Sequence, residues 1–334
     1  MAKKLSSAEE IISGFSNLNA LIIGDVMIDA YLWGKVNRIS PEAPVPIVAI
    51  SKKENRLGGA ANVAINVQAL GAIPVLCSVI GTDSDSKTFI ELLQKQGLTT
   101  EGIIQSPSRT TTVKTRVIGN NHQMLRVDEE VEDEINHSDR KQLIDRITAL
   151  VKSRKIDVII FEDYDKGVIG KFLIGEVVKL AGNKGIPVAV DPKKKNFNHY
   201  RQVTLFKPNL KELREGMKVD LDKGNINEVS HVIKKLAEEN QIETVLVTLS
   251  EKGAYVYNKK DSKYLPAHVR NIADVSGAGD TVISVAALCI ASGASPVTAA
   301  ILSNFAGGIV CEKVGVVPIE KSQLIKELKT AKLF

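Results

Sequence analysis

Short runs of apolar residues alternate with longer amphipathic stretches along most of the chain. The apolar runs are typical of buried strands and cover residues 20–24, 74–80, 158–161, 187–190 and 244–248. Between them, apolar positions recur at helical spacing over residues 60–70, 86–96, 170–181 and 229–239. Gly71, Gly97 and Gly185 follow three of these stretches, where a helix often ends in a left-handed residue. The alternation predicts right-handed βαβ units and an α/β fold, with a mostly parallel central sheet and helices on both faces.

Two segments, residues 31–54 and 110–127, interrupt the alternation. The first is rich in Pro, Val and Ile and the second in Thr, Val and Arg, and no helical stretch adjoins either of them. We therefore expect a small separate β-sheet, inserted twice from the main domain. Such a sheet needs a ligand or a second subunit to cover its face and edge. With no internal repeat and no low-complexity linker, residues 1–334 form one expected domain with this sheet as an elaboration.

Composition and charge narrow the class of protein. Aromatic residues make up 4% of the chain while aliphatic residues are plentiful, which favours a buried parallel sheet. The net charge of +5 comes from 44 basic and 39 acidic residues spread along the chain. A nucleic-acid surface needs clustered basic residues, and the densest run, Lys193-Lys194-Lys195, is short. That run is either a solvated loop or a loop that attracts phosphate, and no nucleic-acid partner is expected.

The cysteines and the N-terminus indicate the compartment. Cys77, Cys289 and Cys311 are far apart and form no C-x-x-C pair, which argues against a disulfide framework and a zinc site. The N-terminal Met-Ala-Lys-Lys-Leu-Ser-Ser is followed by acidic residues, unlike a signal peptide. The longest apolar stretches are interrupted before they could cross a bilayer. We expect a cytoplasmic protein without membrane association.

The strongest chemical signal is the turn Ser276-Gly277-Ala278-Gly279-Asp280, which opens the helical stretch 281–291. Small residues let the backbone approach an anion closely, and free N–H groups at a helix N-terminus favour negative charge. A carboxylate at a site that favours anions can be explained if it acts as a general base and takes the proton of an attacking hydroxyl. The alternative is an ordinary glycine-rich turn capped by Asp280. Neither a P-loop nor a complete dinucleotide fingerprint occurs in the chain.

Two distant motifs resemble those of one family. Residues 274–280 look like the C-terminal signature of the ribokinase-like (PfkB) carbohydrate kinases, and residues 58–64 resemble their N-terminal di-glycine motif. The resemblance covers nearly the whole chain and implies a ribokinase-like fold and ATP-dependent phosphorylation of a sugar. It also implies that Asp280 is the catalytic base and that the N–H groups of Gly277, Ala278 and Gly279 stabilise the developing charge.

The same resemblance implies where ATP and Mg²⁺ bind. Lys207-Pro208-Asn209-Leu210-Lys211-Glu212 is similar to the family's Asn-x-x-Glu motif, so Asn209 and Glu212 would hold the magnesium, partly through water. A plain helix-capping pattern is the alternative for these two residues. The resemblance places further nucleotide contacts at Lys207, Thr248, Ser250, Gly253 and Asn304. Ser250 departs from the family, which more often has Gly there, and Asn304 could instead be a helix residue that faces small neighbours.

Polar residues on the sugar side follow the first strand. Asp25 and Asp29 come at its C-terminal end, where ligands bind in open α/β sheets, and carboxylates suit sugar hydroxyls. A metal site competes with this interpretation, although no His or Cys accompanies the two carboxylates. The family resemblance adds Gly58, Gly59 and Asn62 of the di-glycine motif to the expected sugar site.

Further stretches point to a subfamily. Residues 38–46, 116–128, 163–167 and 191–193 resemble segments of the bacterial heptose-phosphate kinases, which convert D-glycero-D-manno-heptose 7-phosphate to the 1,7-bisphosphate. The resemblance implies substrate contacts by Arg116, Arg126, Asp163, Lys166 and Lys193. Four of these are cations, which a sugar phosphate needs and a neutral sugar does not. For each cation, an ordinary surface charge is the alternative.

Alternatives remain open at this stage. The substrate could be a ketose phosphate, a sugar acid or a nucleoside, or the chain could be a sugar-phosphate sensor without activity. Because no His-x-Gly-His motif occurs, we expect a stand-alone kinase without a nucleotidyltransferase domain. Its product could serve lipopolysaccharide or a GDP-heptose route. We also expect a homodimer joined through the small sheet, whose outer Val, Ile and Leu residues no local helix can bury. A mobile, monomeric lid is the alternative.

Overall fold

A nine-stranded sheet forms the centre of the computed structural model, which describes residues 8–331 except 223 and 268–269. The strand order is β13-β12-β11-β10-β9-β8-β1-β4-β5, with β12 and β13 antiparallel and the other strands parallel. The strands are β1 (Asn19–Gly24), β4 (Ile73–Ile80), β5 (Ile103–Gln105), β8 (Val158–Glu162), β9 (Val188–Asp191), β10 (Leu205–Phe206), β11 (Thr244–Thr248), β12 (Ala254–Asn258) and β13 (Asp261–Leu265). The predicted α/β fold, with its mostly parallel central sheet and a small separate sheet, is confirmed.

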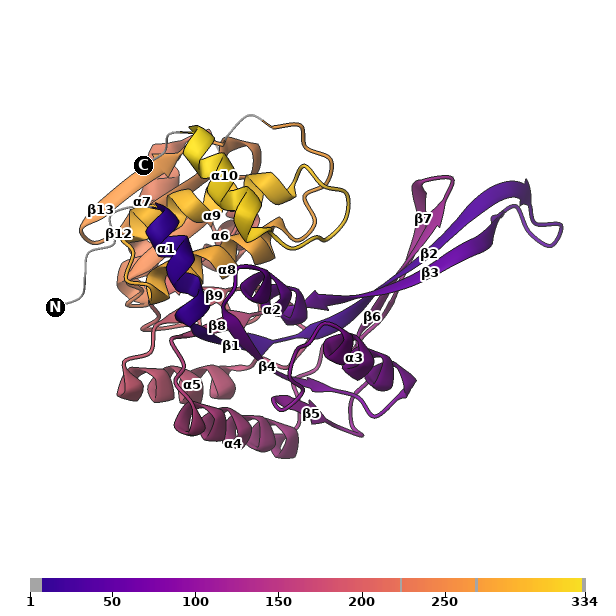
Figure 1. Cartoon of the computed structure of the whole chain (residues 1–334), viewed down its shortest axis with the longest axis horizontal. Helices are drawn as coiled ribbons and strands as arrows, with labels where there is room; N and C mark the ends of the chain where they lie inside the picture. Colours follow the sequence, from indigo (N-terminus) through magenta and orange to yellow (C-terminus); the bar gives the residue numbers. More distant parts are fainter. Residues whose placement is uncertain (1–7, 223, 268–269, 332–334) are drawn as a thin grey trace.

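Helices cover both faces of this sheet (Figure 1). One face packs against α1 (Ala8–Gly14), α2 (Ala60–Ala69), α3 (Ser84–Lys95), α8 (Ala278–Ala291), α9 (Pro296–Val310) and α10 (Lys321–Ala331). The other face packs against α4 (His137–Ser153), α5 (Lys171–Lys184), α6 (Leu210–Met217) and α7 (Ile226–Glu239). Alternate residues of β1 enter the two cores, Ile22 on the first side and Leu21 and Ile23 on the second. Burial on both sides explains why these strands are continuous apolar runs in the sequence.

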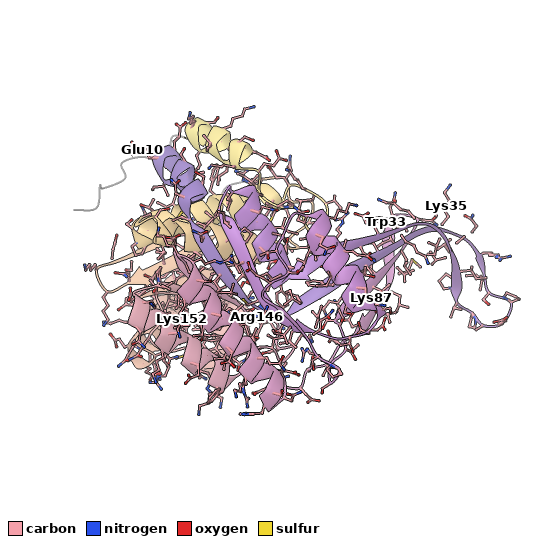
Figure 2. The ribbon with its side chains drawn as sticks, turned by 60° about the horizontal axis from the view of Figure 1, so that its bottom comes forward. Glu10, Trp33, Lys35, Lys87, Arg146 and Lys152 are labelled. Atoms are coloured by element: carbon pink, nitrogen blue, oxygen red, sulfur yellow. The ribbon has the colours of Figure 1, made fainter. Side chains whose placement is uncertain are left out.

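The small separate sheet is a four-stranded lid, in the order β3-β2-β6-β7. Its strands are β2 (Val26–Ile39), β3 (Pro46–Gly59), β6 (Val113–Gly119) and β7 (His122–Glu129). The lid projects from the body in Figure 1, and Trp33 and Lys35 lie on its projecting part in Figure 2. The lid strands extend further inward than the predicted segment 31–54, because the first residues of β2 are buried in the main core.

Several local predictions can be compared with the structure. Gly71, Gly97 and Gly185 have φ of 94°, 72° and 66°, so each is left-handed after its helix as expected. Cys77, Cys289 and Cys311 are all free, and Cys311 is partly exposed. Within the described part of the chain, none of the helices has the length and apolar character needed to cross a bilayer. Residues 1–7, on which the expectation of no signal peptide rests, lie outside the described residues.

The arrangement of the parallel strands determines where a ligand can bind. β1, β8, β9, β10 and β11 all run in the same direction, so their C-terminal ends meet at one edge of the sheet. The chain leaves β1 toward β4 on one side and returns through β8 toward β9 on the other, so the strand order reverses between β1 and β8. In open α/β sheets ligands bind outside the carboxyl ends at such a point. The glycine-rich turn before α8 lies at this edge as well, across from β8 and β9.

Candidate active site

The turn before α8 has the backbone of an anion-binding site. Gly277 has φ of 77°, a left-handed conformation that suits glycine, and the helix begins at Ala278. The first N–H groups of a helix have no partner within it, and the helix dipole adds positive character there. The N–H of Ala278 donates to the carbonyl of Val275 at 3.3 Å, so it is engaged within the turn itself. Of the three predicted amides, those of Gly277 and Gly279 therefore remain the better candidates for a phosphate.

Asp280 is buried in the first turn of α8 and is held from two sides. Its Oδ2 accepts a hydrogen bond from the Asn62 amide at 2.5 Å, and its Oδ1 accepts one from the Tyr164 hydroxyl at 3.0 Å. Burial raises the pKa of Asp280 to about 6, and the charge of Asp191 acts in the same direction, while the Asn62 bond opposes the rise. A carboxylate with a pKa near neutrality can take a proton from a hydroxyl at physiological pH. The position and the chemistry suit the predicted base.

Lys207 lies next to Gly279, where the missing side chain leaves room. A Cβ at Gly279 would be 3.6 Å from the Lys207 ammonium and 3.7 Å from Asp191 Oδ2. Lys207 is 3% exposed, and its Nζ is 2.8 Å from that same Asp191 oxygen. An ammonium and a helix N-terminus thus face one small space. A transferring phosphoryl group needs such positive surroundings.

A cavity of about 350 Å³ extends outward from this centre. It is lined by residues predicted to bind the nucleotide, Thr248, Ser250, Gly253 and Asn304, together with the start of α8. The volume is within the range of small-molecule sites. The lining also contains two exposed apolar side chains, Ile272 and Val275, and the cation Arg270, which the sequence analysis did not identify. They lie in the irregular segment before the turn, where no periodic pattern marks them.

Ser250 has a backbone conformation that suits glycine, the residue that the family more often has at this position. It begins the short 3₁₀ helix η2 (Ser250–Lys252) with φ of 54°, a left-handed conformation that disfavours residues with a Cβ. Gly253 ends this helix with φ of 93° and lies so close to the backbone of Leu265 that a Cβ would collide with it. Serine at position 250 therefore holds a left-handed backbone at the cost of local strain.

The Asn209 and Glu212 side chains form a capping box at the start of α6. Asn209 Oδ1 accepts from the Glu212 N–H at 2.9 Å, and Glu212 Oε2 accepts from the Asn209 N–H at 2.8 Å. The other Glu212 oxygen accepts a hydrogen bond from Lys193. The structure thus realises the capping pattern, and these residues do not fit as direct ligands of a magnesium ion. A contact through water is compatible with their place at the sheet edge.

The sugar side of the site lies at the base of the lid. Arg116 donates to Asp29 Oδ1 at 2.5 Å, and Asp29 is opposite Arg56 across β2 and β3. A Cβ at Gly58 would overlap the Asp29 carboxylate, so the glycine leaves room for this side chain. Gly59 turns the chain into α2 with φ of 61°, which presents Asn62 toward Asp280. The di-glycine motif and the α8 turn, far apart in the sequence, meet in one site.

Two predicted sugar ligands have a different role. Asp25 is 1% exposed, and its oxygens accept from the N–H groups of Tyr164, Lys166 and Val168. Asp163 is fully buried and accepts from the N–H of Asp165 and from two side chains, Asn196 and Tyr200. Both carboxylates hold the loop after β8, and their oxygens are already bonded. We therefore correct the expectation that Asp25 and Asp163 bind sugar.

The four predicted phosphate-binding cations are all paired. Arg126 Nε is 2.9 Å from an Asp128 oxygen. Lys166 Nζ is 2.7 Å from Glu130 and 2.6 Å from Glu132. Lys193 forms an ion pair with Glu212, at the end of the site where the nucleotide is expected. Lys193 also lies over the Tyr164 ring, 5.4 Å from its centre. Among the four, Arg116 is the one whose side chain contacts a predicted sugar ligand, Asp29.

Arg56 is a further cation on the face of the lid that carries Lys114, Arg116 and Arg126, and the sequence analysis missed it. The Arg56 and Arg116 guanidinium carbons lie 4.9 and 5.4 Å from the centre of the Tyr31 ring. Arg56 also reaches toward Gly315, since a Cβ there would be 2.9 Å from its Nη1. The sequence does contain a signal for Arg56. Side chains alternate between the two faces of a strand, so Arg56 lies on the same face as Gly58, two residues further along.

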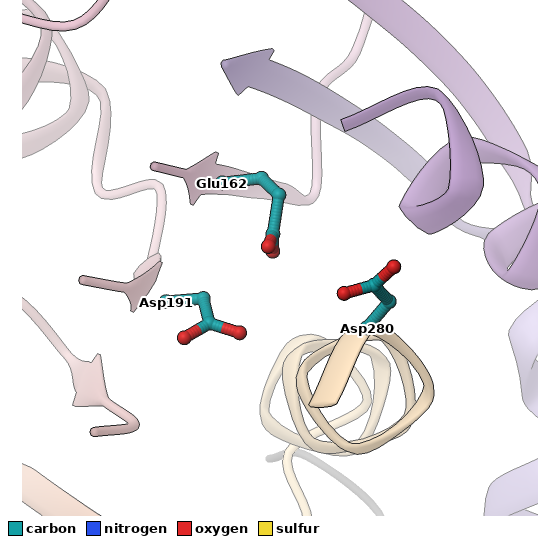
Figure 3. A group of neighbouring side chains, drawn as sticks. All are labelled: Glu162, Asp191 and Asp280. Atoms are coloured by element: carbon teal, nitrogen blue, oxygen red, sulfur yellow. The ribbon is translucent and has the colours of Figure 1, made fainter. Parts of the chain in front are cut away.

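A group of carboxylates at the strand ends was also missed. Glu162 ends β8 and Asp191 ends β9, and with Asp280 they form a cluster whose nearest oxygens all lie within 4.8 Å of one another (Figure 3). Burial and the charges of the other two carboxylates raise the pKa of Glu162 well above its usual range. The signal was the shared position, because residues that end neighbouring parallel strands lie side by side.

A sheet-edge anion site, a nucleotide-sized cavity beside it and a buried carboxylate together define an ATP-dependent kinase that acts on an alcohol group. The comparisons with known proteins agree and identify the acceptor as a sugar. The profile of the pfkB family carbohydrate kinases matches residues 17–322. The chain belongs to the pfkB family of carbohydrate kinases.

Among its relatives is the bifunctional protein HldE of Geobacter sulfurreducens, 36% identical over 325 residues, which are 96% of this chain and 65% of that protein. The bifunctional protein HldE of Desulfatibacillum aliphaticivorans is 40% identical over 320 residues, which are 95% of this chain and 64% of that protein. The chain thus spans slightly less than two thirds of the length of these relatives.

Solved structures show the same fold at low sequence identity. Phosphofructokinase-2 from Escherichia coli in complex with fructose-6-phosphate superposes with a TM-score of 0.74 and 16% identity, over 94% of this chain and 99% of that chain. Arabidopsis thaliana ribokinase complexed with ribose and ATP superposes with a TM-score of 0.71 and 16% identity, over 93% and 99% of the two chains.

Proposed function

We propose that this sugar kinase transfers the γ-phosphate of ATP to the anomeric hydroxyl of D-glycero-D-manno-heptose 7-phosphate and forms the 1,7-bisphosphate. The observation that carries the choice of a sugar phosphate is the pair of guanidinium groups, Arg56 and Arg116, on either side of Tyr31 and next to Asp29. Guanidinium groups bind phosphate through two parallel hydrogen bonds. The lid segments that resemble those of heptose-phosphate kinases support the particular sugar.

Each residue of the site has its own proposed role in this reaction. The sugar would lie between Asp29 and Asn62, with its 7-phosphate toward Arg56 and Arg116. Asp280 takes the proton of the attacking hydroxyl, and the start of α8 with Lys207 stabilises the charge that develops on the transferring group. ATP would occupy the cavity between η2 and α9, and Mg²⁺ would neutralise its phosphates. Closure of the lid would exclude water, which otherwise competes as acceptor.

A panel of sugars and sugar phosphates tests the substrate. ADP release should be fastest with the heptose 7-phosphate, and the unphosphorylated heptose should be a poor substrate. Faster turnover of a ketose phosphate, a sugar acid or a nucleoside would place the chain elsewhere in the family. A lack of turnover with every compound would favour a sugar-phosphate sensor over a kinase.

A pair of variants tests the phosphate contact. A lost charge-assisted hydrogen bond corresponds to about 1.5–3 kcal/mol, so Arg56→Ala should raise the KM for the heptose 7-phosphate roughly 10- to 100-fold. The KM for ATP should stay within about twofold of the wild type. Arg154→Ala is the matched control, because this arginine pairs with Glu101 away from the lid. An equal effect of Arg56→Ala on an unphosphorylated sugar would exclude a phosphate contact.

We also propose that two copies of the chain join through their lids. Side chains alternate across a strand, so Leu32, Val48, Val117, Leu125 and Val127 share the face opposite Asp29 and Arg116. Leu125 is 57% exposed and Val127 is 44% exposed. An apolar face of this kind favours a two-fold partner.

Light scattering at micromolar concentration should give twice the chain mass of 36.2 kDa, whereas a mass near 36.2 kDa excludes the dimer. Val48→Asp should yield monomers, and an intact dimer would place the interface elsewhere.

A further inference from the structure

The loop after β8 brings a tyrosine to the proposed base. Tyr164 comes shortly after the end of β8, and its hydroxyl donates to Asp280 Oδ1 at 3.0 Å. The other oxygen of Asp280 accepts from Asn62, which belongs to α2. Two elements that are far apart in the sequence thus hold one carboxylate. The proposed reaction places Asn62 in the sugar site and leaves Tyr164 without a role.

The backbone of Tyr164 is held as well as its hydroxyl. Its N–H donates to Asp25 Oδ2 at 2.9 Å, and the same carboxylate accepts from the N–H groups of Lys166 and Val168. Asp25 is buried, so water does not compete for these bonds. Asp25 therefore fixes the loop from which the Tyr164 side chain reaches Asp280.

The ring of Tyr164 has a separate contact. The Lys193 ammonium lies 5.4 Å from the centre of the ring, and Lys193 pairs with Glu212. The face of an aromatic ring attracts a cation whether or not the ring carries a hydroxyl. A phenylalanine at position 164 can therefore keep the ring in place, so that the hydroxyl can be removed alone.

The hydroxyl of Tyr164 is a lasting donor. Burial raises the pKa of Tyr164 well above its usual range, and the negative charges of Asp280, Glu162 and Asp191 act in the same direction. Among the charges that face Asp280 itself, Asp191 raises its pKa and Lys207 lowers it. The Tyr164 bond also lowers the pKa of Asp280, because a hydrogen bond to the ionised form favours that form.

We propose that Tyr164 is a positioning residue for the base, and that its hydroxyl holds the Asp280 carboxylate in the orientation that proton abstraction requires. Each carboxylate oxygen can accept a second hydrogen bond, so the bonds from Tyr164 and Asn62 leave a lone pair for the attacking hydroxyl. A carboxylate that is already oriented does not have to reorganise during the reaction. The inference rests on the proposed role of Asp280 and is independent of which sugar the kinase accepts.

Tyr164→Phe tests this role. It should lower kcat roughly 10- to 100-fold, as expected for one hydrogen bond to a charged group, and leave both KM values little changed. The acid limb of the kcat–pH profile should move to higher pH by about one unit, because Asp280 loses a donor that favours its ionised form. Both proteins use the same substrates, so ionisation of the substrate phosphates does not contribute to the difference.

Tyr255→Phe is the matched control. Tyr255 is a buried tyrosine of β12 whose hydroxyl lies 2.8 Å from that of Ser230 in α7. Its loss should lower the melting temperature and leave kcat and the pH profile as in the wild type. If Tyr164→Phe gives this same pattern, the Tyr164 hydroxyl serves packing alone and the proposal is overturned.

Two further variants keep the proposal testable if Tyr164→Phe folds poorly. Incorporation of 3-fluorotyrosine at position 164 keeps the hydroxyl and makes it a stronger donor, so the acid limb should move to lower pH. An unmoved limb would refute the role of Tyr164. Asp280→Asn separates this inference from the proposed function: an active Asp280→Asn would refute the base itself. An inactive Asp280→Asn beside a fully active Tyr164→Phe would refute the role of Tyr164 alone.

Discussion

Replacement of Asp280 by asparagine removes the proposed base and keeps the shape of the side chain. The new amide can still accept from Asn62, and the Tyr164 hydroxyl can rotate to accept from it, so both contacts of the native carboxylate have a counterpart. Loss of general-base assistance should lower kcat about 10²- to 10⁴-fold, which corresponds to roughly 3–5 kcal/mol of transition-state stabilisation. ATP binding should change little, because the nucleotide cavity extends away from this side chain.

The same substitution should change how the stability of the protein depends on pH. Burial raises the pKa of Asp280 from 3.8 to about 6, so the folded state holds this proton more tightly than the unfolded state. The carboxyl group therefore favours folding most below pH 4, and this contribution is lost as the pH rises through 6. The difference of about two units corresponds to at most ~3 kcal/mol. Asp280→Asn should thus be more stable than the wild type at pH 8, and the gain should shrink toward pH 5.

Two measurements check these expectations. Coupled ADP release gives kcat and both KM values, and thermal unfolding in EDTA at pH 5 and pH 8 gives the stability without divalent cations. A variant that keeps more than half of the wild-type kcat would show that Asp280 is not the base. A variant that loses stability equally at both pH values would show that the burial of this carboxylate does not carry the stated cost.

Three other substitutions test the remaining parts of the site. Ser250→Gly should raise stability by roughly 0.5–1 kcal/mol because φ of 54° disfavours a Cβ, and a lower melting temperature would contradict this. Gly58→Ala should displace the Asp29 carboxylate and raise the sugar KM about tenfold or more with the ATP KM unchanged; an unaltered sugar KM would remove Asp29 from the site. Glu212→Gln should preserve the cap of α6, since Gln also serves in a capping box, yet raise the Mg²⁺ requirement more than the sugar KM. An unchanged Mg²⁺ titration would discard the role of Glu212 in organising the metal.

The sheet was predictable because its central strands are buried on both faces. β1, β4, β8, β9 and β11 are therefore apolar runs that differ visibly from the amphipathic helices between them. The lid was found for the opposite reason, since two β-rich segments lacked helices to cover them. The inner ends of the lid strands were missed. Val26 and Ile28 are apolar and buried in the main core, so the sequence does not show where the main sheet ends and the lid begins.

The site was predicted where a motif is local and missed where it depends on register. The turn around Asp280 and the di-glycine motif can be recognised in the sequence, and the structure brings them together through Asn62. Glu162 and Asp191 become neighbours through the pairing of β8 with β9, which a single sequence does not display. Asp163 was assigned to the sugar from its place in a motif, although burial makes it a support of the loop.

The most direct test of the proposed reaction is phosphorus NMR of the product formed from ATP and the heptose 7-phosphate. Transfer to the anomeric hydroxyl predicts ADP together with a second phosphate monoester whose signal is coupled to the anomeric proton. The ester at position 7 should remain unchanged. Release of ADP with inorganic phosphate alone, or a new ester coupled to any other sugar proton, would contradict the account.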